Sequence, residues 1–322
     1  MKAKKLLKIT GVITVIIVLV LAAAFLYLDS EKATLNDDER SGLPGQFVDL
    51  SKGTVHYDLA GPNDAPTVVL VHGFSVPYYV WDPTFDALVD AGFRVLRFDL
   101  YGRGYSDRPN LEYSLDLFTE QLEELLVALE IEEPVSLVGL SFGGPVVTAF
   151  ANRHPDQVRG LGLIDPQVSS VSTGDIFPMN VPVLGDIIMA VYVVPVMLPE
   201  TQSSDFYRPE GFPYWEDQYR DQMQYTGFRS ALLSTTREMV GMDPLAEYQT
   251  LSKAGIPVVL FWGREDQTIS AGDIAMLRKA LPDHEFHAID EAGHLPHYER
   301  PEVVNPLLIE FLENVESEIF SN

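Results

Sequence analysis

Short apolar runs recur along the middle and end of the chain, and a polar or glycine-containing turn follows each of them. The runs cover residues 67–71, 94–100, 135–140, 158–164, 256–262 and 285–289. Amphipathic stretches, notably residues 115–129, separate several of them. Strands that alternate with helices predict a mostly parallel sheet with helices on both faces. Residues 46–50 and 54–59 flank a Ser-Lys-Gly turn and predict an opening antiparallel hairpin.

The alternation breaks between residues 167 and 255. Proline, methionine and aromatic residues are frequent there, and residues 181–198 are almost entirely apolar. Such a segment placed over a sheet can build an enclosed apolar pocket and exclude water from it. We therefore expect a substrate with an apolar part. Asp186 and Pro195 argue against a membrane span in this stretch.

The motif Gly139-Leu140-Ser141-Phe142-Gly143-Gly144 is the most informative part of the sequence. An apolar run precedes it and a helix-compatible run follows it, which is the arrangement of a nucleophile elbow with serine at its apex. The flanking glycines allow the sharp turn. The N-terminus of the following helix offers free N–H groups and a partial positive charge to a developing oxyanion. Ser141 is therefore the candidate nucleophile.

A serine nucleophile needs a base, and the base needs an acid that orients it. The run 256–262 ends in Gly263-Arg264-Glu265-Asp266, and the run 285–289 is followed by Glu291-Ala292-Gly293-His294. Each candidate partner thus follows a strand, at the carboxyl edge of the sheet where ligand sites of parallel sheets collect.

Together these motifs resemble those of the α/β-hydrolase family, over roughly residues 46–315. The matching motifs are His72-Gly73-Phe74, Asp99-Leu100-Tyr101-Gly102-Arg103-Gly104-Tyr105-Ser106, the Ser141 elbow, Gly263-Arg264-Glu265-Asp266, and Gly293-His294 with Glu299-Arg300-Pro301. The resemblance implies an α/β-hydrolase fold. Its sheet would be mostly parallel and eight-stranded, with helices on both faces and a helical cap inserted after the sixth strand.

The resemblance also implies a role for each site residue. Ser141 would be the nucleophile, His294 the base and Asp266 the acid. The backbone N–H groups of Phe74 and Phe142 would form the oxyanion hole. His294 would take the serine proton, and an acyl-enzyme would form and then be hydrolysed by water.

Alternatives exist for two of these residues. The family's Gly-x-x-Asp spacing favours Asp266 over Glu265, but Asp165 also remains open because some relatives place the acid after the sixth strand. The Gly-His step favours His294 over His297 as the base.

We expect an enzyme that hydrolyses carboxylic esters, either small or lipid-like with an apolar acyl part. The family uses the same triad on C–C bonds, lactones and amides and for perhydrolysis, so these reactions stay open. Relatives that open epoxides or remove halides use an aspartate nucleophile, which Ser141 argues against. A non-catalytic binding protein usually lacks a triad member, whereas all three candidates are present. Asp99 and Arg103 recur in the family, and we expect them to shape their loop.

Residues 9–28 form an uncharged, mostly apolar stretch, with four lysines before it and acidic residues after it. As a helix it would span about 30 Å, the thickness of a bilayer core. The positive-inside rule then places the N-terminus in the cytoplasm and the rest of the chain outside. We predict an uncleaved signal anchor that makes the protein a single-pass membrane protein. A cleaved signal peptide and a secreted protein are the alternative, since Ala22-Ala23-Ala24 offers small residues.

Composition narrows the possible partners. The net charge of −25 argues against nucleic-acid binding. There is no cysteine, so we expect no disulfide. His284-x-x-His287 and His294-x-x-His297 have no cysteine or carboxylate at a matching spacing, and there is no nucleotide-binding motif, so we expect no metal or cofactor. The predicted organisation is an anchor (1–28), a linker (29–45), a first part of the hydrolase core (46–166), a cap (167–255) and a second part of the core (256–322).

Overall fold

The computed structural model describes residues 8–13, 15–16, 19–20, 23, 27–28 and 30–321, with only the backbone for residues 318–321. Much of the predicted anchor, residues 1–28, therefore lies outside the described residues. Its described residues are helical. Their large apolar side chains are mostly exposed, for example 59% for Val12, 63% for Leu19 and 87% for Tyr27.

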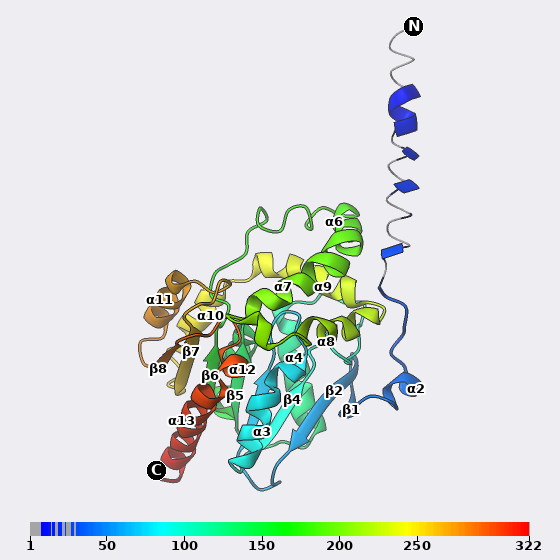
Figure 1. Ribbon diagram of the computed structural model, residues 1–322. Helices are drawn as coiled ribbons and strands as arrows, with labels where there is room; N and C mark the ends of the chain where they lie inside the picture. Colours follow the sequence, from blue (N-terminus) through cyan, green and yellow to red (C-terminus); the bar gives the residue numbers. More distant parts are fainter. Residues whose placement is uncertain are drawn as a thin grey trace.

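An eight-stranded sheet organises the domain (Figure 1). Its strands are β1 (Gln46–Leu50), β2 (Gly53–Ala60), β3 (Thr67–Val71), β4 (Arg94–Phe98), β5 (Val135–Leu140), β6 (Val158–Ile164), β7 (Val258–Gly263) and β8 (Glu285–Ile289). Their order is β1-β2-β4-β3-β5-β6-β7-β8. β2 pairs antiparallel with β1 and β4, and all other pairs are parallel. The predicted hairpin and mostly parallel sheet are confirmed.

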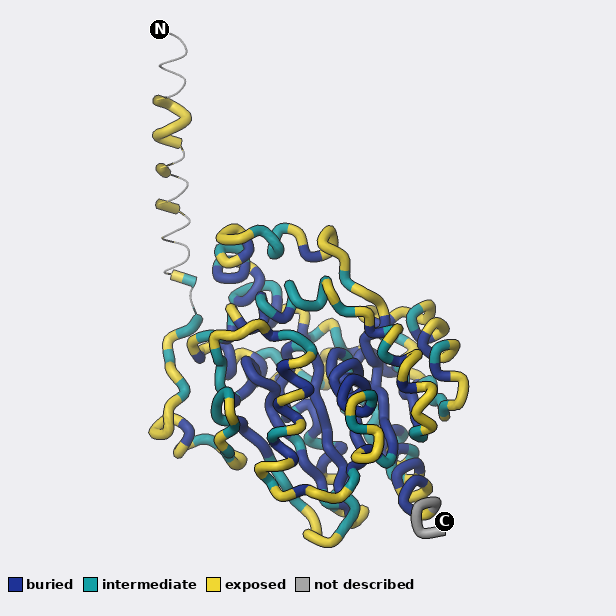
Figure 2. Tube along the Cα trace, turned by 180° about the vertical axis from the view of Figure 1, so that it is seen from behind, coloured by how far each residue is buried: buried dark blue, intermediate teal, exposed yellow. Residues whose placement is uncertain are grey.

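Helices cover both faces of the sheet, as the sequence pattern predicts. α4 (Leu115–Ala128), α5 (Gly143–Arg153) and α11 (Ala271–Ala280) pack on one face, and α3 (Asp82–Asp90) and α13 (Pro301–Ser321) on the other. β3 and β5 are buried at every position, which explains their uninterrupted apolar sequences. Seen from behind, the buried strands fill the centre of the domain (Figure 2).

The fourth strand ends at Phe98, two residues before the apolar run does. The difference arises at Asp99, whose buried carboxylate accepts hydrogen bonds from the backbone N–H groups of Tyr78 and Tyr105, at 2.8 and 2.9 Å. His56 Nδ1 lies 2.7 Å from the same carboxylate. This side chain therefore fixes the turn after β4, as expected of a loop-shaping residue.

The chain between β6 and β7 forms a layer of helices at one end of the sheet (Figure 1). We call residues 184–251 the helical layer; it contains α6 (Leu184–Ile188), a π-helix (Met189–Met197), α7 (Leu198–Gln202), α8 (Trp215–Asp221), α9 (Phe228–Glu238) and α10 (Pro244–Leu251). Within the described residues, one helical stretch, Leu184–Asp205, is long and apolar enough to cross a membrane. Its residues Met189 and Val194 are buried in the apolar core that also contains Phe228 and Leu232 of α9.

The chain that follows the apolar N-terminal stretch is attached to this helical layer. The N–H groups of Lys32 and Ala33 donate to Gln224 O at 2.8 and 2.9 Å, and Thr226 N donates to Ala33 O at 2.8 Å. The carboxylate of Glu31 accepts hydrogen bonds from the backbone of residues 227 and 229. Residues 31–33 are thus bound to the domain through both main chain and side chain.

The central position of β5 generates a stability prediction. Leu137 is fully buried there, so Leu137→Ala should lower the free energy of unfolding by about 2–5 kcal/mol. The same change at Leu111, which is 44% exposed, should cost less than about 1 kcal/mol. Urea unfolding followed by circular dichroism measures both values. Equal losses in the two variants would contradict this assignment of the core.

Candidate active site

Ser141 lies in a sharp turn between β5 and α5. Its φ of 52° is left-handed, a conformation that costs a non-glycine residue about 1–3 kcal/mol and is often found at functional sites. Ser141 N donates to Ile164 O of β6 at 2.9 Å, and Ser141 O accepts from Gly144 N and Gln167 N, both at 3.0 Å. These bonds hold the turn on the end of the neighbouring strand.

Two glycines allow this turn to pack closely. A Cβ atom on Gly143 would lie 2.3 Å from Val71 O of β3, and one on Gly139 would lie 2.5 Å from Gly143 O. Because these contacts are with backbone atoms, no side chain can move to relieve them. The close approach explains the glycines of the elbow motif.

The structure brings His294 and Asp266 together. His294 Nδ1 donates to Asp266 Oδ2 at 2.8 Å. The other carboxylate oxygen of Asp266 accepts the backbone N–H groups of Thr268 and Ile269, at 2.6 and 3.1 Å. Both Asp266 oxygens are therefore held, and the ring of His294 is oriented through Nδ1, while its Nε2 bonds to no residue that the structure describes.

The two rival residues make other contacts. Glu265 accepts a hydrogen bond from Ala292 N at 3.1 Å, so it supports the histidine loop from outside. His297 is buried against Trp81, and its Nε2 donates to Val80 O at 3.0 Å. Burial lowers the pKa of His297 to about 3, which keeps this ring neutral.

Asp165, the third rival, lies beside Asp266 at the end of β6. Its carboxyl is fully buried and accepts Gly263 N at 3.1 Å. Burial, together with the nearby Asp266 carboxylate, raises the pKa of Asp165 well above its ordinary value. Two adjacent buried carboxyls cannot both be ionised cheaply. The hydrogen bond between the two carboxyls raises the pKa of Asp165 and lowers that of Asp266. The side chains of Asp165, Asp266 and His294 thus lie together in one buried cluster.

The pKa of His294 is raised above its ordinary value. Burial by itself lowers it, but the charge and hydrogen bond of Asp266 outweigh burial, and the nearby Asp205 carboxylate adds to the rise. Asp205 belongs to the helical layer, and its carbonyl accepts His294 N at 2.7 Å. No motif in the sequence indicates Asp205, because its contact depends on how a distant segment folds over the site.

The Ser141 hydroxyl makes no hydrogen bond to any residue that the structure describes. Hydrogen bonds of catalytic groups are often long without substrate and shorten when it binds. Adjacent strands nevertheless place the candidate residues at one edge: Ser141 N bonds to the last residue of β6, and Asp165 N bonds to Phe261 O of β7 at 3.0 Å. Asp266 follows β7 by three residues.

The loop after β3 lies against Ser141. A Cβ atom on Gly73 would be 3.2 Å from the Ser141 Cβ. The N–H groups of Phe74 and Phe142 donate to no described residue, so both are free to bind an oxyanion. His72 Nε2 accepts Leu100 N at 2.9 Å, so its other nitrogen, Nδ1, carries the proton and donates to Gly73 O at 2.8 Å.

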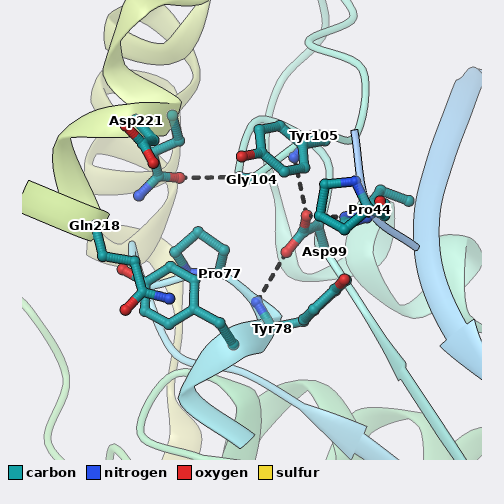
Figure 3. Close-up of a pocket in the computed structure, with 11 residues that line it drawn as sticks. Pro44, Pro77, Tyr78, Asp99, Gly104, Tyr105, Gln218 and Asp221 are labelled. Carbon is teal, nitrogen blue, oxygen red and sulfur yellow. Dashed lines mark hydrogen bonds and ion pairs between the residues drawn. The ribbon is translucent and has the colours of Figure 1, made fainter. Parts of the chain in front are cut away.

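A separate cavity of about 140 Å³ lies between the turn after β4, the start of the 3₁₀-helix Tyr78–Trp81, and α8 (Figure 3). Its lining residues include Tyr78, Asp99, Tyr105 and Asp221. Ser141 is not among them. The cavity therefore does not contain the predicted nucleophile.

The fold and these motifs agree with the comparisons with known proteins. The sequence model of the "Alpha/beta hydrolase family" matches residues 68–307, so the chain belongs to this family. "AB hydrolase superfamily protein YfhM" of Bacillus subtilis is 27% identical over 297 residues, covering 85% of this chain and 99% of the relative.

Other relatives carry names of several hydrolases. "Monoacylglycerol lipase ABHD6" of Bos taurus is 24% identical, and the alignment covers 80% of this chain and 78% of the lipase. The crystal structure of the enol-lactonase from Burkholderia xenovorans LB400 superposes with a TM-score of 0.72 at 22% identity, covering 83% of this chain and 100% of the lactonase. Relatives also include an epoxide hydrolase, so membership of the family defines a hydrolase fold but not the bond that is cleaved.

The pairing of His294 with Asp266 generates a prediction about titration. Asp266→Asn removes the negative charge that stabilises the imidazolium, so burial should dominate and the pKa of His294 should fall below its ordinary value. Asp205→Asn should lower it by a smaller amount. Nitrogen-15 NMR titration measures both shifts, with the His294 signal assigned from His294→Gln. An unchanged His294 pKa in Asp266→Asn would contradict the pairing.

Proposed function

We propose that the chain is a serine hydrolase that cleaves carboxylic esters with an apolar acyl part. The observation that carries the proposal is the hydrogen-bonded pair His294–Asp266, which lies at the same sheet edge as the elbow serine. Ser141 is the nucleophile, His294 the base and Asp266 the acid. This assignment uses Asp266 rather than Asp165, because Asp266 contacts the imidazole directly.

The reaction follows from these positions. His294 Nε2 takes the proton of the Ser141 hydroxyl as its oxygen attacks the ester carbonyl carbon. The carbonyl oxygen becomes an oxyanion, and the N–H groups of Phe74 and Phe142 donate to it. His294 then gives the proton to the leaving alcohol. Water then attacks the acyl carbon of the acyl-enzyme while His294 takes one of its protons. As the bond between this carbon and Ser141 Oγ breaks, His294 gives the proton to Oγ, which releases the acid and restores Ser141.

We assign the role of a cap to residues 167–255, between hydrolase core parts 46–166 and 256–322. The helical layer within it contacts both loops that carry the reacting groups: Asp205 O accepts His294 N, and Gln222 Nε2 donates to Ser75 O at 2.9 Å. Its sequence is rich in apolar and aromatic residues, which supports an apolar pocket. Ester, lactone and C–C bond hydrolases can share this arrangement, and the apolar cap favours an ester with an apolar acyl group, small or lipid-like.

We also propose that residues 1–28 anchor the enzyme in the cell membrane, with the domain outside the cytoplasm. The exposure of described apolar side chains such as Val15, Ile16 and Leu19 supports this, since a soluble domain buries such a run. A secreted form, cut near Ala22-Ala23-Ala24, is the alternative.

Hydrolysis of p-nitrophenyl esters from C2 to C16 by the full chain in detergent tests the reaction. Ser141→Ala should lower kcat by at least about 10³-fold, because no nucleophile remains. Ser252 lies on the exposed surface, so Ser252→Ala should leave kcat unchanged. The optimum acyl length would then size the pocket. Wild-type protein that is folded but inactive on every ester would move the assignment to C–C, lactone or amide bonds.

The anchor has its own test. Wild-type protein should stay in the membrane fraction after an alkaline carbonate wash, and its N-terminus should be intact by mass spectrometry. Val15→Asp with Leu19→Asp should release it, because each aspartate costs about 2.5–3.5 kcal/mol at the centre of a span. Recovery of a shortened chain from the medium would instead show a cleaved signal peptide.

A further inference from the structure

Arg103 is a buried cation without an acidic partner. Its side chain is fully inaccessible, and no ion pair among the described residues includes it. Burial lowers the pKa of Arg103 to about 10, so the guanidinium is still charged at neutral pH. An unpaired charge in a protein interior is costly, and it persists where surrounding groups or a function hold it.

The guanidinium nitrogens donate to three uncharged oxygens, which belong to the loop after β3, the loop after β4 and α9. Nε donates to Phe74 O at 2.8 Å, Nη1 to Tyr101 O at 3.1 Å, and Nη2 to Thr235 Oγ1 of α9 at 3.0 Å. The ring of Phe118 lies 5.2 Å from the guanidinium carbon and adds a cation–π contact. Arg103 therefore connects the Phe74 loop to the helical layer.

Gln222 follows α8 directly and binds the same loop at Ser75, the residue after Phe74. Its side chain is 2% exposed. Its Nε2 donates to Ser75 O at 2.9 Å, and its Oε1 accepts Gly104 N at 2.9 Å; the dashed line at Gly104 in Figure 3 marks this second bond. Both ends of the amide are thus occupied.

Three consecutive carbonyl groups of this loop are held by side chains. Gly73 O accepts from His72, Phe74 O from Arg103, and Ser75 O from Gln222. The N–H and C=O of one planar peptide point in opposite directions, so fixing a carbonyl also fixes the attached N–H. The Gly73 carbonyl and the Phe74 N–H belong to one peptide, which adjoins the peptide that Arg103 holds.

We propose that Arg103 and Gln222 are positioning residues of the oxyanion hole. They hold the two peptides that follow the Phe74 N–H and so keep this N–H directed at the substrate carbonyl, and the charge of Arg103 adds a positive potential there. This rests on the proposed function. Charge that develops in a water-excluded site interacts strongly with a fixed cation, because little solvent screens it. Neither residue contacts the transition state directly; each acts through its hydrogen bond to the loop. Because Thr235 and Gln222 belong to the helical layer, the layer also sets the shape of the hole.

The test compares Arg103→Met, Arg103→Lys and Gln222→Leu with Arg159→Met as the matched control. Arg159 pairs with Glu316 at the start of β6, whereas the candidate site lies beyond the carboxyl ends of the strands, so loss of this arginine should leave kcat unchanged. Loss of one oxyanion donor lowers kcat about 10²–10³-fold, so loss of its positioning in Arg103→Met should cost about 10–100-fold, with KM changed less than about threefold. Arg103→Lys should recover part of kcat. Active sites are counted by fluorophosphonate titration, so that misfolded protein does not enter kcat.

Affinity for an alkylboronic acid, which forms a tetrahedral adduct with an active serine, separates this role from a structural one. It should fall in parallel with kcat in Arg103→Met and in Gln222→Leu. Folded variants that retain wild-type kcat and boronate affinity would overturn the proposal. If Arg103→Met does not fold, Gln222→Leu and Arg103→Lys decide by the same readouts. Wild-type protein without ester hydrolysis would instead reject the proposed function, and this result is distinct because it needs no variant.

Discussion

The parallel hydrogen-bond ladder through β3, β5, β6 and β7 is the constraint on which the rest of the site depends. Because these strands run in the same direction, the residues that follow them meet at one edge. The bond from Ser141 N to β6 and the bond from Asp165 N to β7 continue this ladder past the ends of the strands. The left-handed turn at Ser141 and the buried Asp165–Asp266 contact are tolerated because the ladder fixes the backbone on either side.

The helical layer is as much a part of the site as the sheet. It supplies the carbonyl that accepts His294 N, and its Gln222 donates to Ser75 O in the loop after β3. Its Thr235 accepts from Arg103, which in turn donates to Phe74 O of the same loop. Glu299 adds a further connection, since its carboxylate accepts Gly293 N at 2.6 Å and Tyr207 N at 2.8 Å. Movement of the layer would therefore disturb His294 and the loop of Phe74 together.

The sequence predicts well what local geometry determines. The elbow glycines, the Gly-x-x-Asp step and the Gly-His step each lie at the end of one strand, so a short motif carries the placement of Ser141, Asp266 and His294. Strand ends were less certain: the run 94–100 stops at Phe98 because Asp99 accepts bonds from a loop twenty residues earlier.

Asp205 and Gln222 could not be predicted, because their partners lie about 90 and 147 residues away and neither belongs to a motif. The sequence does contain Arg103 within a family motif, but it does not indicate that no acidic side chain pairs with Arg103 among the described residues. That property depends on three elements packing together: the loop after β3, the loop after β4, and α9. Contacts of this kind follow from the tertiary structure and leave no periodic or local signal.

The attachment of residues 31–33 to residues 224–229 has a geometric consequence. Leu28 and Glu31 are three residues apart, which is at most about 10 Å of extended chain. If a hydrophobic segment that ends at Leu28 were inserted in a membrane, this short connection would keep residues 224–229 of the helical layer close to the membrane surface.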